Sequence, residues 1–392
     1  MIDAFEGIKV LDLCRGFPPA YATMFLADFG ADVIKIAPPA QNSGYSSKVT
    51  PDRWSACYSI DRGKKGLAIN LKNERGRDIF LKLAKDADVI MENSRAGAME
   101  RLGVGYETIN RINPNIIYCS ISGYGTNGPY KDLPGHGSSY EGVAGILSLF
   151  GQKGGPPMNT GPFVADMGGA ACHALIGTLI ALWVREKTGK GQFIDVAYLD
   201  SVLSLAHWQV SVYQALGIMP KRGEVPEMGS DPCSGMYRTK DGEYFCLAAD
   251  EPGFWANLLR ELGGEEYIPF QRTEDQRKKE EIFGWLREKF LTKTRDEWWE
   301  WFKGKDIAGG PVYSLEEGLR DPQVLHREMV LELEHPRAGK VKQVGIGIKL
   351  SESPGKFRSF APLPSEHTAE ILQSLGYTEE QIEELKSSGA IA

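Results

Sequence analysis

His136 and Asp166 are the two residues of this sequence whose types and spacing are best suited to chemistry. Each lies in a glycine-rich stretch, His136 within residues 135–137 and Asp166 within residues 161–169. An imidazole and a carboxylate that converge on one pocket can remove a proton from a substrate and return it. The carboxylate alone can instead attack a substrate as a nucleophile. The choice between these two reactions decides what the protein does.

Both residues also have ordinary structural explanations. Asp166 comes just before an apolar stretch with helical character, and a carboxylate at a helix N-terminus is stabilised by the helix dipole. The glycines of the 161–169 stretch favour a functional role, because glycine lets a ligand approach the backbone closely. A single histidine is more often structural than catalytic. Glu251, which precedes Pro252, is by its position a helix-start acid.

Apolar and charged segments alternate along the first half of the chain in the manner of repeated strand–helix units. Expected strands lie at 9–13, 32–36, 67–71, 89–91, 116–121 and 193–196, and expected helices at 20–29, 74–85, 106–112 and 167–186. Units of this length build a mostly parallel sheet with helices on both faces. We therefore predict an α/β fold for this part of the chain.

The composition changes after about residue 215. Residues 219–235 are rich in proline and glycine and are typical of a linker or lid, and residues 236–246 predict a β-hairpin with an Asp-Gly turn. Residues 271–303 are dense in charge and tryptophan, which indicates amphipathic helices. We predict a large domain of residues 1–215, completed by the C-terminal part 326–392, and a smaller α+β domain of residues 216–325.

Bulk composition excludes several classes of function. The net charge of −7 gives no reason to expect binding to nucleic acid or to an anionic membrane. None of the 6 cysteines forms a C-x-x-C pair, so we expect no zinc site and no disulfide framework. Scattered thiols fit a reducing cytoplasm. Residues 1–20 contain no apolar signal core, and the apolar stretch 170–184 is short for a membrane span.

Two phosphate-binding signals are ambiguous. Residues 123–128 match G-x-G-x-x-G, but Pro129 follows and no helix opens there to hold a pyrophosphate, so we interpret them as a tight loop beside a pocket. Four cations lie near expected strand ends, where open α/β sheets bind ligands, and both phosphate binding and simple solvation stay open for them. These cations are Arg62, Lys64, Arg95 and Arg101.

Several longer stretches match one known family. They are residues 7–13, 26–36, 61–65, 92–97 with 101–103, 122–125, 188–192, 310–312 and 321–324. With these stretches the chain resembles the family III CoA-transferase (CaiB/BaiF) superfamily, which also contains the α-methylacyl-CoA racemases, over nearly its whole length.

The resemblance implies a Rossmann-like large domain, a small domain and two identical chains interlocked as a dimer, with active sites between the large domain of one chain and the small domain of the other. It implies an acyl-CoA substrate, with coenzyme A as the thioester carrier and no prosthetic group. Asp166 falls on the catalytic Asp of the family. The residues expected to contact CoA are Arg62, Lys64, Arg95 and Arg101 at its phosphates, together with Asn93 and Tyr140.

The two branches of the superfamily differ in chemistry. In the transferases this Asp attacks the thioester and becomes an aspartyl-CoA thioester. In the racemases the Asp and a His act on opposite faces of the α-carbon through an enolate. Residues 135–140 are similar to the racemase G-H-x-x-x-Y loop, and residues 251–254 to its E-P-x-F segment, whose Glu supports the His. We therefore predict racemase chemistry with Asp166, His136 and Glu251 as catalytic residues, and CoA transfer as the alternative.

Two single positions and one short stretch depart from the racemase pattern. Gly137 stands where racemases usually have Asp, and Gly161 lies five residues before Asp166, a feature that is common in transferases. Residues 36–39 replace the acidic and Arg residues that often touch the nucleotide, so CoA contact is not expected there.

Overall fold

The computed structural model describes residues 2–39, 49–225 and 229–392, so residues 226–228 of the expected linker lie outside it. The chain divides into two compact units. The larger unit comprises Met1–Ile146, Thr160–His207 and Pro322–Ala392, and the smaller unit comprises Leu147–Asn159 and Trp208–Asp321. The change of unit thus comes at 207/208 and 321/322, where the sequence suggested 215/216 and 325/326. The segment Leu147–Asn159 belongs to the smaller unit although it lies within the first half of the chain.

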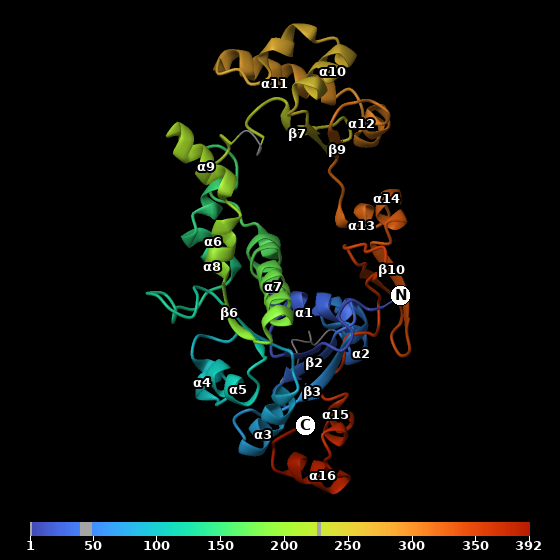
Figure 1. The fold of residues 1–392 in the computed structure, drawn as a ribbon. Coiled ribbons are helices and arrows are strands. Elements are labelled where there is room, and N and C mark those ends of the chain that lie inside the picture. The colour runs from blue at the N-terminus through green and yellow to red at the C-terminus, as the bar shows by residue number, and fades with distance from the viewer. Residues whose placement is uncertain (1, 40–48, 226–228) are drawn as a thin grey trace. The chain divides into compact units, whose positions relative to one another are not determined.

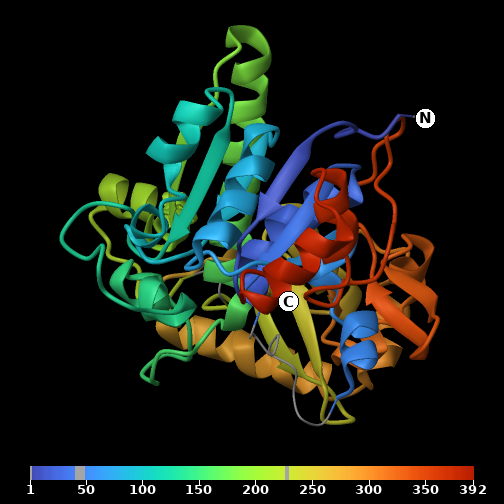
Figure 2. The same ribbon diagram turned by 90° about the horizontal axis from the view of Figure 1, so that it is seen from below.

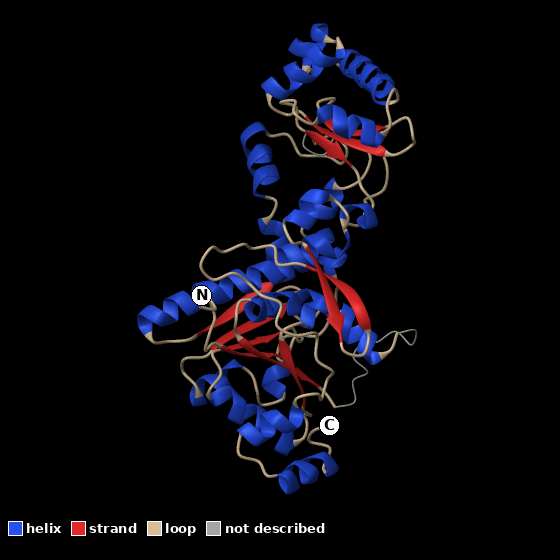
Figure 3. Cartoon of the chain, turned by 90° about the vertical axis from the view of Figure 1, so that its right-hand side faces the viewer, coloured by secondary structure: helices blue, strands red, loops and turns tan. Residues whose placement is uncertain are grey.

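A six-stranded, all-parallel sheet forms the centre of the larger unit (Figure 3). Its strand order is β3-β2-β1-β4-β5-β6, which confirms the predicted α/β fold with a parallel sheet. The direction of winding reverses between β1 and β4, and sheets of this kind bind ligands at the carboxyl ends of the strands beside that reversal. The strands are β1 (Lys9–Asp12), β2 (Asp32–Ala37), β3 (Lys64–Ala68), β4 (Val89–Glu92), β5 (Ile117–Ser122) and β6 (Gln192–Ala197).

Successive residues of each strand point to opposite sides of this sheet, so apolar side chains lie on both faces. Helices cover both faces and bury these side chains. Val10 packs with residues of α1 and α7, whereas Leu11 packs with residues of α3, α5, α15 and α16. Helix α15 lies beside β3 and α16 packs against α15, and both views show these C-terminal helices next to the N-terminal part of the chain (Figure 1 and Figure 2). The bounds of these helices are α1 (Phe17–Asp28), α3 (Glu74–Lys85), α5 (Tyr106–Ile112), α7 (Cys172–Thr188), α15 (Thr368–Ser374) and α16 (Glu379–Ser387).

The smaller unit contains an antiparallel sheet of three strands in the order β7-β8-β9, with helices packed around an aromatic core. The expected hairpin is present, since β7 pairs with β8. Trp298, from the tryptophan-rich stretch, is buried in this core. The elements are β7 (Ser234–Arg238), β8 (Tyr244–Ala248), β9 (Gly309–Pro311), α10 (Pro252–Leu262), α11 (Gln276–Phe290), α12 (Arg295–Phe302) and α13 (Leu315–Gly318). Helix α9 (His207–Leu216) leads into this unit.

The remaining α-helices and strands belong to the larger unit. They include a C-terminal antiparallel hairpin, β10 with β11. Their bounds are α2 (Pro51–Cys57), α4 (Ala98–Arg101), α6 (Gly137–Val143), α8 (Tyr198–Ser204), α14 (Pro322–His326), β10 (Val330–His335) and β11 (Gly339–Val344).

The long helix expected at 167–186 consists of two parts. A π-helix, η4 (Val164–Ala171), comes first and α7 follows it directly. Gly168 and Gly169 permit the wide turn, because a Cβ atom at these positions would lie 2.9 Å from the Phe163 carbonyl oxygen and 3.0 Å from the Val164 carbonyl oxygen. From the sequence we expected these glycines to let a ligand approach the backbone. The structure gives them another role, because the wide helical turn leaves no room for a Cβ atom at either position.

The helical segment Gly161–Thr188 has a mean hydropathy of 1.7 over its most apolar window and is long enough, by length and composition, to cross a membrane. Core helices of soluble proteins meet the same criterion. One side of α7 packs against α1, β5 and β6 (Figure 1).

A buried ion network joins the first three strands. Lys64 Nζ lies 2.9 Å from Asp12 Oδ2 and 2.7 Å from Asp61 Oδ1, and Lys35 Nζ lies 3.3 Å from Asp12 Oδ2. Burial alone would raise the pKa of Asp12, but the two ammonium groups hold that pKa well below its ordinary value. Strand β3 begins at Lys64, three residues before the predicted strand, because these partners satisfy a lysine in the interior.

Removing one member of this network is expected to be costly. Lys64→Met leaves the Asp12 carboxylate buried without its closest cation, so the free energy of unfolding is expected to fall by about 3–5 kcal/mol. Lys65→Met is the matched control, because the Lys65 side chain is 40% exposed and its ion pair with Asp32 is open to water. The control is expected to cost about 0–1 kcal/mol. Urea unfolding measures both, and equal losses would contradict the prediction.

Candidate active site

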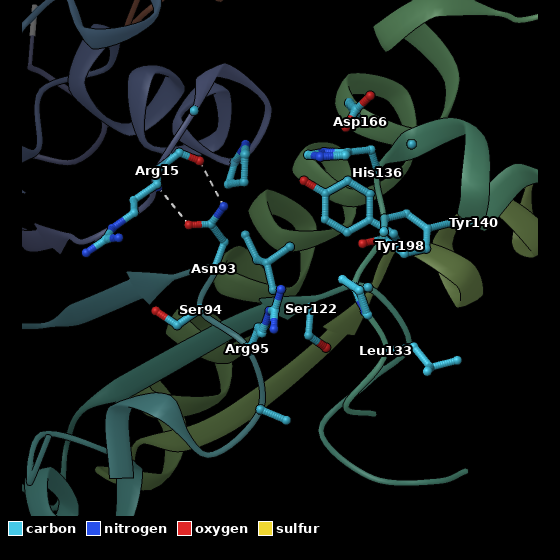
Figure 4. A pocket seen from close by; sticks show the side chains of 18 of the residues that line it. Arg15, Asn93, Ser94, Arg95, Ser122, Leu133, His136, Tyr140, Asp166 and Tyr198 are labelled. Carbon is cyan, nitrogen blue, oxygen red and sulfur yellow. Dashed lines mark hydrogen bonds between the residues drawn. The ribbon is translucent and has the colours of Figure 1, made fainter. Parts of the chain in front are cut away.

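A cavity of about 780 Å³ opens in the larger unit at the carboxyl ends of the parallel strands. His136 and Asp166 both line it, so the two residues that the sequence singled out share one cavity (Figure 4). Its lining residues come from the loops after β1, β4 and β5, from the start of α6, from η4 and from α8. Those used below are Arg15, Asn93, Ser94, Arg95, Gly123, Lys131, His136, Gly137, Tyr140, Asp166 and Tyr198.

Asp166 lies against the first residue of α6. A Cβ atom built on Gly137 would lie 2.5 Å from Asp166 Oδ2 and 3.2 Å from its Cγ. Any side chain at position 137 would therefore displace the carboxylate from its present place. This contact gives a physical reason for the absence of the Asp that racemases usually have after their His.

Glu141 is a completely buried acid behind Asp166. Both of its carboxylate oxygens lie 2.7 Å from Thr160 Oγ1, and Oε1 accepts the Ala165 amide N–H at 3.1 Å. Burial raises the pKa of the half-buried Asp166, the nearby Glu141 charge raises it further, and His136 offsets part of the rise. The Ala165 amide is thus already engaged and is not free to hold a substrate oxygen.

His136 is the N-cap residue of α6, and its side chain is exposed at the cavity. Its backbone N–H lies 3.4 Å from Ser139 Oγ, and its carbonyl accepts the Ser139 N–H at 2.8 Å. The His136 and Asp166 side chains lie near one another on the cavity wall (Figure 4). An imidazole and a carboxyl group of raised pKa therefore meet the same volume, which is what proton transfer to and from a substrate requires.

Tyrosine rings form the wall beside this pair. The Tyr140 ring fits between two glycines, since a Cβ atom would lie 2.6 Å from it at Gly123 and 2.7 Å from it at Gly135. Tyr140 also contacts Tyr124 and Tyr198, with ring centroids 5.0 Å and 5.1 Å apart. Gly123, the first residue of the G-x-G-x-x-G stretch, thus serves side-chain packing at the cavity.

The opposite wall is fixed by reciprocal hydrogen bonds between two strand-end loops. Asn93 Oδ1 accepts the backbone N–H of Arg15 at 2.7 Å, and Asn93 Nδ2 donates to the Arg15 carbonyl at 2.9 Å (Figure 4). The preceding residue, Cys14, is held in the same way, because its N–H donates to Asp12 and its carbonyl accepts from Lys35. Asn93 therefore lines the cavity, but its amide is occupied in holding the loop after β1, and its contact with CoA stays a prediction.

A second cavity of about 460 Å³ adjoins the first, and Arg95 and Lys131 line both. Arg101 lines the second cavity only. Glu92 lies at its buried end, where its carboxylate accepts hydrogen bonds from Ser120 Oγ at 2.5 Å and from the Ser94 N–H at 2.6 Å. Burial raises the pKa of Glu92. The three cations are suited to an anionic ligand, and contact of Arg95 and Arg101 with CoA phosphates stays a prediction.

Two of the expected phosphate ligands have another role. Arg62 is 1% exposed, and its Nε and Nη2 donate to Asp28 at 2.9 and 2.7 Å. Lys64 is 2% exposed and serves the buried network described above. Neither lines either cavity. The assignment of Arg62 and Lys64 to CoA phosphates is therefore wrong, because their charges are already neutralised inside the fold.

Glu251 lies in the smaller unit. It is the N-cap residue of α10 with Pro252 next, and its side chain is exposed. Its backbone therefore has the helix-start position that the sequence indicated, and its support of His136 stays a prediction.

Sequence reasoning missed several cavity-lining residues, among them Arg15, Lys131 and Tyr198. Arg15 follows β1, so the strand-end rule that selected Arg95 would also have found it. Tyr198 carries no motif signal, and its position depends on α8 packing against η4.

Comparison with known proteins agrees with this geometry. The chain matches CoA-transferase family III over residues 5–368. The chain belongs to this family. It is 32% identical to the Homo sapiens succinyl-CoA:glutarate CoA-transferase, over 100% of this chain and 90% of that protein. It is also 32% identical to the Homo sapiens alpha-methylacyl-CoA racemase, over 99% of this chain and 97% of that protein.

Solved structures agree as well. A CAIB/BAIF family protein from Brucella suis superposes with a TM-score of 0.82 at 28% identity, covering 96% of this chain and 100% of that one. These comparisons confirm the resemblance to this superfamily. The enzymes of the superfamily act on CoA thioesters.

Position 137 offers a direct test of the contact with Asp166. Gly137→Ala is expected to displace the Asp166 carboxylate and to lower acyl-CoA turnover by roughly 100-fold. Gly142→Ala in the same helix is the matched control, because a Cβ atom there meets nothing within 4 Å. The control is expected to keep its turnover and to gain about 0.5–1 kcal/mol of stability. Steady-state kinetics of the two variants decide the matter, and unchanged turnover in Gly137→Ala would refute the close contact.

Proposed function

We propose that the protein epimerises the α-carbon of a 2-methylacyl-CoA by two-base proton transfer. The observation that carries the proposal is the joint presence of His136 and Asp166 on the wall of one cavity in the larger unit. One residue removes the α-proton of the thioester, and an enolate forms. The other residue then delivers a proton to the opposite face. One proton leaves the substrate and one returns, so no further reactant is required.

The electrostatics of Asp166 support this reaction. A two-base epimerase begins each turnover with one base protonated and the other free, and the pair must exchange these states when the substrate enters with the opposite configuration. An ordinary Asp has a pKa near 3.9 and gives up its proton far more readily than an imidazole of pKa near 6.5. Burial and the Glu141 charge raise the pKa of Asp166. A carboxyl group whose pKa is raised holds a proton more readily, which suits a residue that must both accept and deliver the α-proton.

The alternative is a CoA-transferase. In that reaction Asp166 attacks the thioester carbonyl and the CoA thiolate leaves, which gives a mixed anhydride. The thiolate then attacks the Asp166 carbonyl, so that the carboxylate of the former acyl group leaves and an aspartyl-CoA thioester remains. An acceptor carboxylate takes the CoA by the same two steps in reverse, and Asp166 is restored. The similarity to the succinyl-CoA:glutarate CoA-transferase favours this reading, as does Gly161 five residues before Asp166. Under this chemistry His136 has no obligatory role.

Hydrogen exchange at the α-carbon separates the two reactions. With a 2-methylacyl-CoA in D₂O and no acceptor acid, we expect the wild-type protein to incorporate deuterium at the α-carbon and to erase the chirality of the substrate. His136→Ala and Asp166→Ala each remove one base, so each is expected to lower racemisation by at least roughly 100-fold. Mass spectrometry and chiral chromatography of the recovered acyl group provide the readouts, and His326→Ala on the exposed surface is the control.

CoA-transferase activity would give a different set of results in these experiments. A transferase would show no deuterium incorporation, would be active only with a free carboxylic acid, and would carry a CoA adduct on Asp166 that survives in the His136→Ala variant. That outcome would reject the epimerase and establish the alternative.

We further propose that two identical chains form the interlocked dimer implied by the family. The outward side of α7 supports a second copy as its occupant, because Ile176, Ile180 and Trp183 on it are each more than half exposed in the single chain. Apolar side chains grouped in this way mark interaction surfaces. A dimer interface also accounts for the apolar character of this helix without a lipid environment.

A charge on this surface is expected to weaken the dimer. Trp183→Glu places a carboxylate on the apolar side of α7 and is expected to shift the protein toward monomer. Lys190→Glu, just beyond the end of the helix, is the charge-changing control and is expected to leave the dimer intact. Light scattering after size-exclusion chromatography measures both. A wild-type monomer would overturn the proposal.

A further inference from the structure

A histidine and a serine hold the π-helix that carries Asp166. His173 Nδ1, in the first turn of α7, lies 2.8 Å from the carbonyl oxygen of Gly169 in η4. Its Nε2 lies 3.0 Å from Ser204 Oγ in α8. Ser204 Oγ in turn lies 2.7 Å from the Ser201 carbonyl oxygen. One imidazole thus links the π-helix to a neighbouring helix through both of its ring nitrogens.

The chemistry of these partners fixes how the ring is used. A carbonyl oxygen can only accept a hydrogen bond, so Nδ1 carries the proton and donates it to Gly169. In the neutral ring Nε2 is then an acceptor. The single Ser204 hydroxyl proton can be donated either to Nε2 or to the Ser201 carbonyl oxygen, so these two acceptors share one donor. His173 and Ser204 are half-buried, and neither lines the catalytic cavity. These two residues therefore have no place in the reaction itself.

The π-helical segment of residues 164–171 requires contacts from its surroundings to keep its conformation. A π-helical turn contains one residue more than an α-helical turn, is uncommon, and occurs often at functional sites. Gly168 and Gly169 permit this turn here, but glycine adds no rigidity. The close packing of α8 is also part of the arrangement, since a Cβ atom on Gly169 would lie 3.6 Å from Ser201 Cβ. The His173–Gly169 hydrogen bond joins the two parts at the point where the wide turn passes into α7.

We propose that His173 and Ser204 are positioning residues that keep residues 164–171 in the π-helical register and so keep the Asp166 carboxylate against Gly137. If the segment returned to the α-helical register, the extra residue of the turn would be lost and Asp166 would rotate away from position 137. The role rests on the proposed function only in that Asp166 takes part in turnover, which holds for both epimerase and transferase chemistry.

Four variants test whether the hydrogen bonds of His173 and Ser204 hold residues 164–171 in place; we call this pair of residues the clamp. His173→Phe fills the same space but removes both hydrogen bonds, and His173→Asn keeps an N–H donor at the position of Nδ1. Ser204→Ala removes only the second contact. His326→Phe, on the exposed surface, is the matched control for the histidine substitution. Two quantities are measured: hydrogen–deuterium exchange of the backbone amides of residues 164–171, and kcat and KM for the α-proton exchange reaction.

The expected results form a graded series. His173→Phe speeds amide exchange in residues 164–171 by at least about tenfold, because the local opening of the segment becomes easier. It lowers kcat by at least about tenfold and changes KM by less than about threefold, because the carboxylate is displaced while the binding surface remains. His173→Asn restores most of both values, Ser204→Ala has a smaller effect in the same direction, and His326→Phe has none.

Two results would overturn the proposal. One is wild-type amide exchange in residues 164–171 of His173→Phe. The other is an equal loss of kcat in His173→Phe and His173→Asn, which would assign the effect to the imidazole ring and not to the hydrogen bond. Amide exchange does not depend on catalysis, so a wild-type protein that is inactive toward 2-methylacyl-CoA would reject the proposed function and still leave the clamp tested.

Discussion

The candidate site depends on one close contact, the approach of Asp166 Oδ2 to the backbone of Gly137. This contact requires a particular structure in each of three segments. Helix α6 must begin with a residue that has no side chain, and the turn before α7 must be wide enough to carry Asp166 there. Glu141 must hold the Ala165 amide behind it. The result is a half-buried carboxyl group of raised pKa on the wall of a cavity, a state that an isolated helix-capping Asp does not have.

The fold limits where such a site can form. The winding of the parallel sheet reverses between β1 and β4, and the loops after these strands separate at that point. The polar side chains at these strand ends are largely used to fix the loops: Asn93 holds the backbone of Arg15, and Glu92 holds the amide of Ser94. These hydrogen bonds hold the loops that form the cavity walls, and the groups that face a ligand include His136 and Asp166 together with the cations Arg15, Arg95 and Lys131.

How far the sequence predicts this structure depends on how local each feature is. The α3 and α5 bounds follow directly from hydrophobic periodicity, and the parallel sheet follows from the repeated strand–helix units. The start of β3 at Lys64 was missed because a buried lysine is acceptable only with partners that are distant in sequence, here Asp12. The same omission made Lys64 and Arg62 look like phosphate ligands. The sequence alone does not show whether a cation near a strand end is already paired with a buried carboxylate.

The π-helix shows the same limit within the active site. Periodicity located an apolar helix at 167–186 and placed Asp166 just before it, which is the position of a capping residue. In the structure the helical segment already contains Asp166, and the extra residue of the π turn sets the direction of its side chain. Two glycines and one histidine four residues after Gly169 make that turn possible and keep it in place. Their spacing is visible in the sequence, but its meaning depends on α8, which supplies Ser204 and packs against Gly169.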